Sequence, residues 1–181
     1  MNLIADDKFT DKNTSHSYLP LYDTLLTPMR ETALNVLEIG VQHGGSIDMW
    51  ERFFPNAVIH GADIRDRRRV ALEQGSDGRV RFHLGDAYQK AFAADHFPDT
   101  LFDFVLDDGP HTRKSMLSCI DLYLPLVKTG GVFAIEDVQR SSWIRELTQR
   151  VPEDLRQYVK VYDRRKIKGR YDDIVFTVEV P

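Results

Sequence analysis

Short apolar runs alternate with amphipathic stretches along most of the chain. Runs typical of buried strands cover 36–39, 58–62, 80–84, 102–106 and 132–135, and helical spacing covers 46–53, 66–74 and 115–126. The linker 86–99 shows no clear pattern. Strands that alternate with helices predict β-α-β crossovers, and therefore a mainly parallel sheet with helices on both faces.

The pattern changes after residue 136. A helical stretch at 142–150 is followed by strand-like runs at 158–162 and 174–180, which the polar segment DRRKIKGRYDD joins. A connection that short cannot hold a crossover helix, so the last two strands are predicted to be antiparallel. The predicted fold class is α/β, a Rossmann-like sandwich whose mainly parallel sheet ends in an antiparallel pair.

Composition limits the classes of protein that fit this pattern. The 181 residues are 42% hydrophobic and 29% charged, which suits one compact domain over 1–181. The single cysteine fits a reducing compartment, and the acidic N-terminus does not look like a signal peptide. No apolar run approaches the roughly 20 residues that span a bilayer. We expect a soluble, cytoplasmic protein without a membrane partner.

Charge argues against a nucleic-acid partner. The net charge is −4, and the basic residues form two short clusters, 65–69 and 164–170, that are typical of a solvated face. The oligomeric state stays open, and a homo-oligomer is compatible with the sequence.

Three predicted strands end in polar residues suited to a nucleotide. The first ends in VLEIGVQHGGS, where glycines permit a tight turn into a helix with open amides. The second ends in GADIR, which places Asp63 where ribose hydroxyls bind in nucleotide-binding folds, and the third ends in LGDAY with Asp86. Turn glycines are common in any such fold, and both acids could instead cap helices or turns.

Acidic side chains also follow two apolar strands, in DFVLDDGPH and GGVFAIEDV. These are Asp107 and Asp108, with His111 nearby, and Glu136 and Asp137. They could form a surface charge cluster. Carboxylates at adjacent strand ends repel one another unless positive charge lies between them, so a ligand or metal site is favoured. Glu38 interrupts the first apolar run, and a bound cation would offset the desolvation of its carboxylate.

Together these segments resemble the class I S-adenosylmethionine-dependent methyltransferases. More narrowly, DDGPH and IEDVQ, with DKNTSHSYLPLYD near the N-terminus, resemble the metal-dependent sugar O-methyltransferases of macrolide biosynthesis, the mycinamicin and macrocin type. One departure is Gln42, which stands where the methyltransferase turn has its middle glycine. The chain also shows no counterpart of the extra N-terminal domain that some of these enzymes carry, so the polyketide substrate does not transfer with the chemistry.

The resemblance implies a set of cofactor contacts. Glu38, Gly40 and Gly44 would hold the methionine part of S-adenosylmethionine. Asp63 would accept hydrogen bonds from the ribose hydroxyls. The adenine edge and the remainder of the cofactor site would be formed by Asp86, Ala87 and Asp107.

The resemblance also implies the catalytic apparatus. Asp108, Glu136 and Asp137 would ligate a divalent ion, and an all-oxygen ligand set suits Mg²⁺. His111 would be the general base that takes the proton of an acceptor hydroxyl, which in this family's chemistry is the hydroxyl of a sugar.

Two segments keep two interpretations each. Residues 1–30, with His16, Ser17 and Tyr18, either fold over the cofactor as a lid or form a simple N-cap before a short helix. Asp172 and Asp173 either approach the acceptor pocket or belong to a solvated loop, which is the simpler interpretation.

Three other functions compete with methyl transfer. A nicotinamide oxidoreductase would share Asp63 and the glycine turn, but normally shows G-x-G-x-x-G spacing and needs a substrate-binding portion. A metal-dependent hydrolase would use the same carboxylates, without a need for Glu38 beside a nucleotide-type turn. A non-catalytic binding module would keep the turn without needing His111.

Overall fold

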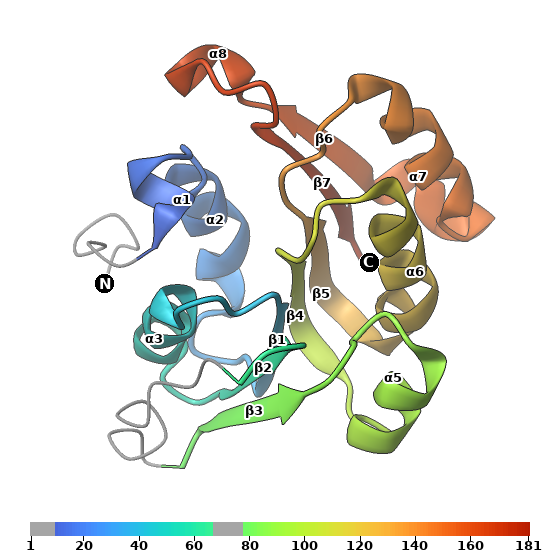
Figure 1. The fold of residues 1–181 in the computed structure, drawn as a ribbon. Helices are drawn as coiled ribbons and strands as arrows, with labels where there is room; N and C mark the ends of the chain where they lie inside the picture. Colours follow the sequence, from blue (N-terminus) through green and yellow to red (C-terminus); the bar gives the residue numbers. More distant parts are fainter. Residues whose placement is uncertain (1–9, 67–77) are drawn as a thin grey trace.

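The computed structural model describes residues 10–66 and 78–181, which form a seven-stranded sheet in the order β3-β2-β1-β4-β5-β7-β6. Strands β1 to β5 run parallel, and β7 is antiparallel to both of its neighbours (Figure 1). The predicted fold class and the antiparallel end pair are therefore confirmed. The strands are β1 Asn35–Ile39, β2 Val58–Asp63, β3 Val80–Leu84, β4 Phe102–Asp107, β5 Val127–Ile135, β6 Val159–Asp163 and β7 Ile174–Glu179.

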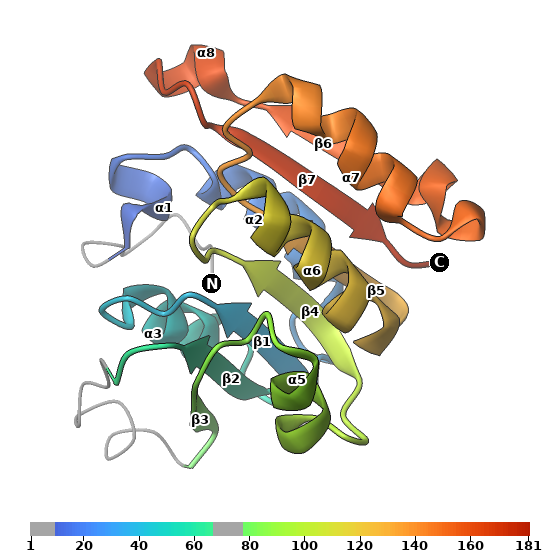
Figure 2. The same cartoon turned by 45° about the vertical axis from the view of Figure 1, so that its right-hand side comes forward.

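Helices cover both faces of the sheet. One face carries α2 (Leu19–Leu26) and α3 (Gly45–Phe53), whereas the other carries α5 (Lys90–His96), α6 (Arg113–Tyr123) and α7 (Ile144–Arg150) (Figure 2). Successive strand residues alternate between the two cores: Phe104 and Leu106 pack with the first group and Val105 with the second. This alternation follows from the two-residue period of a strand, and burial on both faces explains the continuous apolar runs.

Helices of one or two turns complete the described elements. They are α1 (Asp11–Thr14), α8 (Arg165–Lys168) and the 3₁₀ segments Thr27–Met29, Leu124–Leu126, Ser141–Trp143 and Glu153–Tyr158. The linker 86–99 holds α5, which its weak pattern did not predict, and the predicted helix 66–74 lies almost entirely outside the described residues. Among the residues that the structure describes, no helix is both long and apolar enough to cross a membrane.

The strand order places the ligand-binding edge between β1 and β4. From β1 the chain moves outward through β2 and β3, then returns to β4 on the other side of β1. In register, Ile39 at the end of β1 pairs with Asp107, and Asp107 pairs with Ile135 at the end of β5. The loops that follow β1, β4 and β5 therefore meet at one edge, the switch point at which open α/β sheets bind ligands.

Two local signals fix the helices beside this edge. Pro20 lies in the first turn of α2, where its missing N–H costs nothing. Thr112 caps α6 through a reciprocal pair of bonds with Ser115, each 3.1 Å long. The cap starts α6 directly after His111 and so ties the position of that residue to a rigid element.

At the other end of the parallel strands, where they begin, the buried carboxylate of Asp103 in β4 holds the start of β1. Its Oδ2 accepts hydrogen bonds from the backbone N–H of Leu34, 2.8 Å away, and of Asn35, 3.0 Å away. Lys128 of β5 pairs with its other oxygen. One side chain thus connects three strands.

We expect Asp103→Ala to lower the free energy of unfolding by about 1–3 kcal/mol, because two backbone donors lose a charged acceptor. Urea denaturation measures this loss. The control is Asp99→Ala, which removes an exposed carboxylate from the preceding loop and should change stability by less than about 0.5 kcal/mol. Equal stabilities of the two variants would show that Asp103 does not hold β1.

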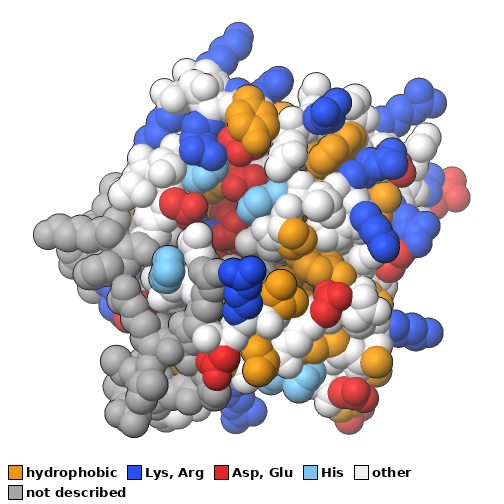
Figure 3. Space-filling view, viewed as in Figure 1, with side chains coloured by type: hydrophobic (Ala, Val, Ile, Leu, Met, Phe, Trp, Pro, Cys, Tyr) orange, Lys and Arg blue, Asp and Glu red, His pale blue; other side chains and the backbone are white. Residues whose placement is uncertain are grey.

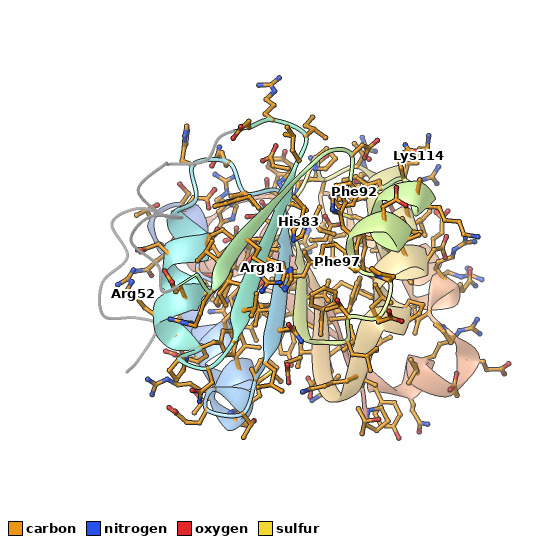
Figure 4. All side chains as sticks on the ribbon, turned by 90° about the horizontal axis from the view of Figure 1, so that it is seen from below. Arg52, Arg81, His83, Phe92, Phe97 and Lys114 are labelled. Carbon is orange, nitrogen blue, oxygen red and sulfur yellow. The ribbon has the colours of Figure 1, made fainter. Side chains whose placement is uncertain are left out.

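Three histidines form a hydrogen-bonded row at the β3 edge. His60 Nδ1 lies 3.0 Å from His83 Nε2, and His83 Nδ1 lies 3.3 Å from His96 Nδ1. His83 also packs against Phe97 with ring centroids 4.8 Å apart (Figure 4). Burial, with the positive charge of a neighbouring histidine as a smaller cause, lowers the pKa of His60 and of His83 to about 4.

These shifts predict acid sensitivity. A histidine whose pKa falls from about 6.5 in the unfolded chain to about 4 in the folded chain contributes stability above pH 6.5, and that contribution is lost as the pH falls towards 4. We expect His83→Gln to lose less unfolding free energy than wild type between pH 7 and pH 5. His43→Gln, which removes an exposed histidine, should lose as much as wild type. A wild-type pH dependence in His83→Gln would contradict the assignment.

Candidate functional site

A cavity of about 610 Å³ opens at the switch point. Its walls come from the turns after β1, β2, β3 and β4 and from the first turn of α6. Six of the eleven predicted site residues line it: Gly40, Asp63, Asp86, Ala87, Asp108 and His111. The other five, Glu38, Gly44, Asp107, Glu136 and Asp137, lie outside the lining.

The turn after β1 depends on residues with positive φ. Gly40 has φ +90°, and a Cβ there would lie 2.1 Å from the carbonyl oxygen of Asp108, so no other residue fits. Gln42, which departs from the methyltransferase pattern, has φ +49°, and Gly44 begins α3 with φ +77°. Gln42 thus adopts the left-handed conformation that a glycine would adopt more easily.

Asp63 braces this turn from the end of β2. Its Oδ2 accepts hydrogen bonds from the backbone N–H of Val41 and of Gln42, both at 3.1 Å, and its Oδ1 accepts one from Arg65 at 2.9 Å. Each carboxylate oxygen can accept more than one bond, so Asp63 retains acceptor capacity towards the cavity.

The opposite wall is organised by Tyr88, which the sequence analysis did not identify. Its hydroxyl donates to Asp107 Oδ1 over 2.5 Å, and its backbone N–H donates to Asp86 Oδ1 over 3.0 Å. Burial raises the pKa of the Asp107 carboxyl to about 6. A Cβ on Gly109 would lie 1.9 Å from the Tyr88 hydroxyl, so the glycine of DDGPH makes room for this ring.

Beside the cavity, Asp108, His111 and Asp137 converge. His111 Nε2 lies 3.8 Å from Asp108 Oδ1 and 3.7 Å from Asp137 Oδ2, and the three residues could hold one ion. His111 and Asp137 have φ of +51° and +52°, strained values that turn both side chains off the strand ends. We call this group the open triad.

Glu136 does not join the open triad. Its side chain accepts a hydrogen bond from the Tyr22 hydroxyl at Oε1, 2.6 Å away, and pairs with Lys12 at Oε2, also 2.6 Å away. Lys12 Nζ also lies 2.6 Å from Asp108 Oδ2 and 3.4 Å from Glu38 Oε1. We call Lys12, Glu38, Asp108 and Glu136 the lysine cluster.

The lysine cluster is almost fully enclosed. Lys12, Glu38 and Glu136 are each at most 1% exposed. Burial raises the pKa of Glu38 to about 7 and that of Glu136 well above its usual range. Burial alone would lower the pKa of Lys12, but the surrounding carboxylates raise it well above its ordinary value. Lys12 therefore stays an ammonium among acids that are short of positive charge.

Glu38 faces this cluster and not the cavity. Trp50 Nε1 donates to its Oε2 over 3.0 Å, and its buried Oε1 lies 3.4 Å from Lys12 Nζ. From the sequence we expected a bound cation to offset the desolvation of Glu38. The cation that the structure shows beside it is Lys12, for which no local pattern gave a signal.

The N-terminal segment covers the acids. His16 Nδ1 lies 2.6 Å from Asp173 Oδ1 and 3.3 Å from Asp137 Oδ1, and the Tyr18 hydroxyl donates to Asp137 Oδ1. The N-cap interpretation concerns α2, the helix that follows His16, Ser17 and Tyr18. Tyr18 is the N-cap residue of α2, and its side chain makes no capping hydrogen bond. The preceding helix, α1, is capped by Thr10, which accepts a bond from the Lys12 backbone N–H. Within this segment Asp11 lines the cavity.

The loop before β7 is buried at its acidic end. Asp172 is 6% exposed and Asp173 is not exposed at all, so the interpretation as a solvated loop is wrong for these two residues. Because His16 joins Asp173 to Asp137, the loop belongs to the same acidic region. Figure 3 shows acidic side chains at the bottom of a hollow, with histidines at its sides.

The donor sets fit the groups that the sequence implies. The cavity has apolar surface at Ile39, Ala62 and Ala87 and carboxylates at Asp63 and Asp86, which together suit a nucleoside. Asp108 and Asp137 offer carboxylate oxygens within 4.8 Å of each other, near enough for both to bind one Mg²⁺, which prefers oxygen ligands.

Comparison with known proteins agrees with this geometry. A family model described as a methyltransferase domain matches residues 37–138. A curated tetracenomycin-C rhamnosyl 2'-O-methyltransferase of Streptomyces olivaceus is 32% identical over 143 residues, which is 74% of this chain and 36% of that protein. Mycinamicin VI 2''-O-methyltransferase of Micromonospora griseorubida is 34% identical over 139 residues, 71% of this chain and 33% of that protein.

A solved structure shares the fold. The MycE methyltransferase from the mycinamycin biosynthetic pathway, in complex with Mg, SAH and mycinamycin VI, matches with a TM-score of 0.70 and 25% identity, over 91% of this chain and 49% of MycE. This chain spans about a third of the length of the curated relatives it matches. Because the family model covers more than half of the chain, including the turn after β1 and the acids after β4 and β5, the chain belongs to the methyltransferase-domain family.

Proposed function

We propose that this protein is an S-adenosylmethionine-dependent, divalent-metal-assisted O-methyltransferase that acts on a hydroxyl of a sugar or a glycosylated small molecule. The observation that carries the proposal is the junction of the two sites. Asp108 and His111 line the nucleoside-sized cavity and also belong to the open triad. A methyl donor in the cavity would therefore lie next to the groups that activate its acceptor.

In this proposal the cofactor lies along the cavity wall. Asp63 accepts hydrogen bonds from the ribose, and Asp86 and Ala87 border the adenine. Gly40 lets the backbone approach the methionine end, and Gly44 ends the turn there. Glu38, whose oxygens face Trp50 and Lys12, would support the turn from behind. Asp107 acts through Tyr88, whose ring it holds against the cavity. The bound cofactor supplies a sulfonium methyl group.

The acceptor would be activated at the open triad. Asp108 and Asp137 would hold the ion, with Glu136 as the third predicted ligand once its contact with Lys12 opens. A divalent ion bound there supplies positive charge that eases loss of a proton from the acceptor hydroxyl. His111, fixed between a glycine-proline turn and the cap of α6, takes that proton, so its position governs the rate of the chemical step.

The named relatives support a sugar as acceptor. They are named as O-methyltransferases of a rhamnosyl tetracenomycin-C and of mycinamicin VI. The proposed enzyme acts in the cytoplasm. Its proposed partners do not include a nucleic acid, a membrane surface or a nicotinamide substrate. A homo-oligomer is compatible with it.

We expect Asp63→Ala to bind S-adenosylhomocysteine more weakly by about 2–4 kcal/mol, because hydrogen bonds to a carboxylate are lost and the turn loses its brace. Isothermal titration measures the affinity. Asp95→Ala, which removes an exposed acid from α5, is the control and should bind as wild type does. Unchanged affinity in Asp63→Ala would show that the ribose does not bind at this wall of the cavity.

We expect methyl transfer from labelled S-adenosylmethionine to an L-rhamnosylated acceptor to stop in EDTA and to return with Mg²⁺.

His111→Ala should lower turnover by roughly 10²–10⁴, the usual contribution of a general base, while S-adenosylhomocysteine binding stays intact. His43→Ala removes an exposed histidine from the turn after β1 and serves as the matched control.

The Mg²⁺ affinity of His111→Ala separates two roles. An unchanged affinity supports a base, whereas a loss of affinity with rescue by excess Mg²⁺ indicates a ligand. Normal turnover in this variant would end the assignment of either role, and full turnover in EDTA would remove the metal from the mechanism.

A further inference from the structure

We propose that Lys12 is a positioning residue of the metal site. Its ammonium is a resident cation that occupies inner oxygens of Asp108 and Glu136 and thereby competes with a divalent ion for them. The inference rests on the proposed metal-assisted function, and it concerns how this chain limits and directs the binding of that ion.

The contacts of Lys12 are specific. Its Nζ lies 2.6 Å from both Asp108 Oδ2 and Glu136 Oε2, and 3.4 Å from Glu38 Oε1, while its side chain is 1% exposed. An ammonium has three hydrogens, and three carboxylates surround it. A lysine enclosed to this degree by acids from β1 and from the ends of β4 and β5 does not serve as a solubilising surface charge.

Neutral donors fix the outer oxygens of the two glutamates. The Tyr22 hydroxyl donates to Glu136 Oε1, and Trp50 Nε1 donates to Glu38 Oε2. Only the inner oxygens are left to face a cation, and Lys12 lies between them. Glu136 therefore reaches the open triad only when Lys12 releases it.

Asp108 is divided between the two groups. Its Oδ2 pairs with Lys12, and its Oδ1 lies 3.8 Å from His111 on the side of the open triad. Lys12 thus holds Asp108 in an orientation that presents one oxygen to an ion next to the cavity. It also supplies a unit of positive charge that lowers the attraction of the site for that ion.

Charge balance gives the expected consequence. Three acids surround one ammonium, and a divalent ion favours their ionised forms, so such an ion is still attracted to the site. Loss of Lys12 would remove this positive charge and free two carboxylate oxygens. The fold would lose a buried cation. A divalent ion would take its place and would bind to the variant more tightly than to wild type.

The test compares Lys12→Met with wild type by titration of Mg²⁺ at pH 8 and by thermal unfolding in EDTA and in Mg²⁺. We expect the variant to bind Mg²⁺ at least about tenfold more tightly, because a unit charge a few Å away has been removed. We also expect a lower melting temperature in EDTA and a larger rise on addition of Mg²⁺. S-adenosylhomocysteine affinity should stay near that of wild type.

The matched control is Lys168→Met. Lys168 is exposed and donates to the backbone carbonyls of Asn13 and Thr14, so it holds the same N-terminal segment without contacting the lysine cluster. We expect this variant to bind Mg²⁺ as wild type does. A gain in Mg²⁺ affinity in both variants would show that detachment of the segment, and not the charge of Lys12, is responsible.

The remaining outcomes separate the inference from the proposed function. If wild type binds Mg²⁺ and Lys12→Met binds it equally or more weakly, the resident-cation role is overturned and the metal site stands. If only Lys12→Met binds Mg²⁺, the resident cation stands and metal-assisted catalysis fails. If neither binds it, both are overturned. Should Lys12→Met not fold, Lys12→Gln keeps a donor without the charge, and failure of both to fold at any Mg²⁺ concentration would also overturn the inference.

Discussion

Mutual repulsion of carboxylates at the ends of β1, β4 and β5 is the constraint on which the rest of the site depends. The parallel register brings Glu38, Asp108 and Glu136 within reach of one ammonium. Buried acids that lie so near to one another are stable only with a cation or a proton among them. The N-terminal segment provides both kinds of partner. Lys12 supplies positive charge, and the hydroxyls of Tyr18 and Tyr22 donate hydrogen bonds without charge.

A second constraint links these acids to the cavity. The backbone at Gly40 passes so close to the carbonyl of Asp108 that a Cβ would overlap it. The turn beside the nucleoside-sized space and the loop that carries Asp108 and His111 are therefore one packed unit. A change in either one is expected to move the other. In the proposed methyl transfer, this shared frame would hold donor and acceptor in a fixed relation.

Much of the fold could be predicted because it is encoded locally. Apolar runs bounded by turn residues marked every strand from β1 to β7, and the short connection before β7 settled its antiparallel direction. The same runs indicated which residues follow each strand, and Asp63, Asp86, Asp108 and His111, which all lie at or just after strand ends, line the cavity. Helix α5 was missed, since its seven residues carry too little periodicity to be distinguished from a loop.

By itself, the sequence determined the α/β class, because this follows from the periodicity of the apolar residues. It also determined that polar site residues lie at the carboxyl ends of the strands and which residue types they are, because this follows from strand polarity. Only the tertiary structure decided which partners the acids have. Lys12 meets Glu136 across 124 residues, and His16 meets Asp173 across 157. Contacts so distant in the chain depend on how the N-terminal segment packs against the finished sheet. No local pattern records that packing, so the division of the acids between a lysine and an open triad could not be read in advance.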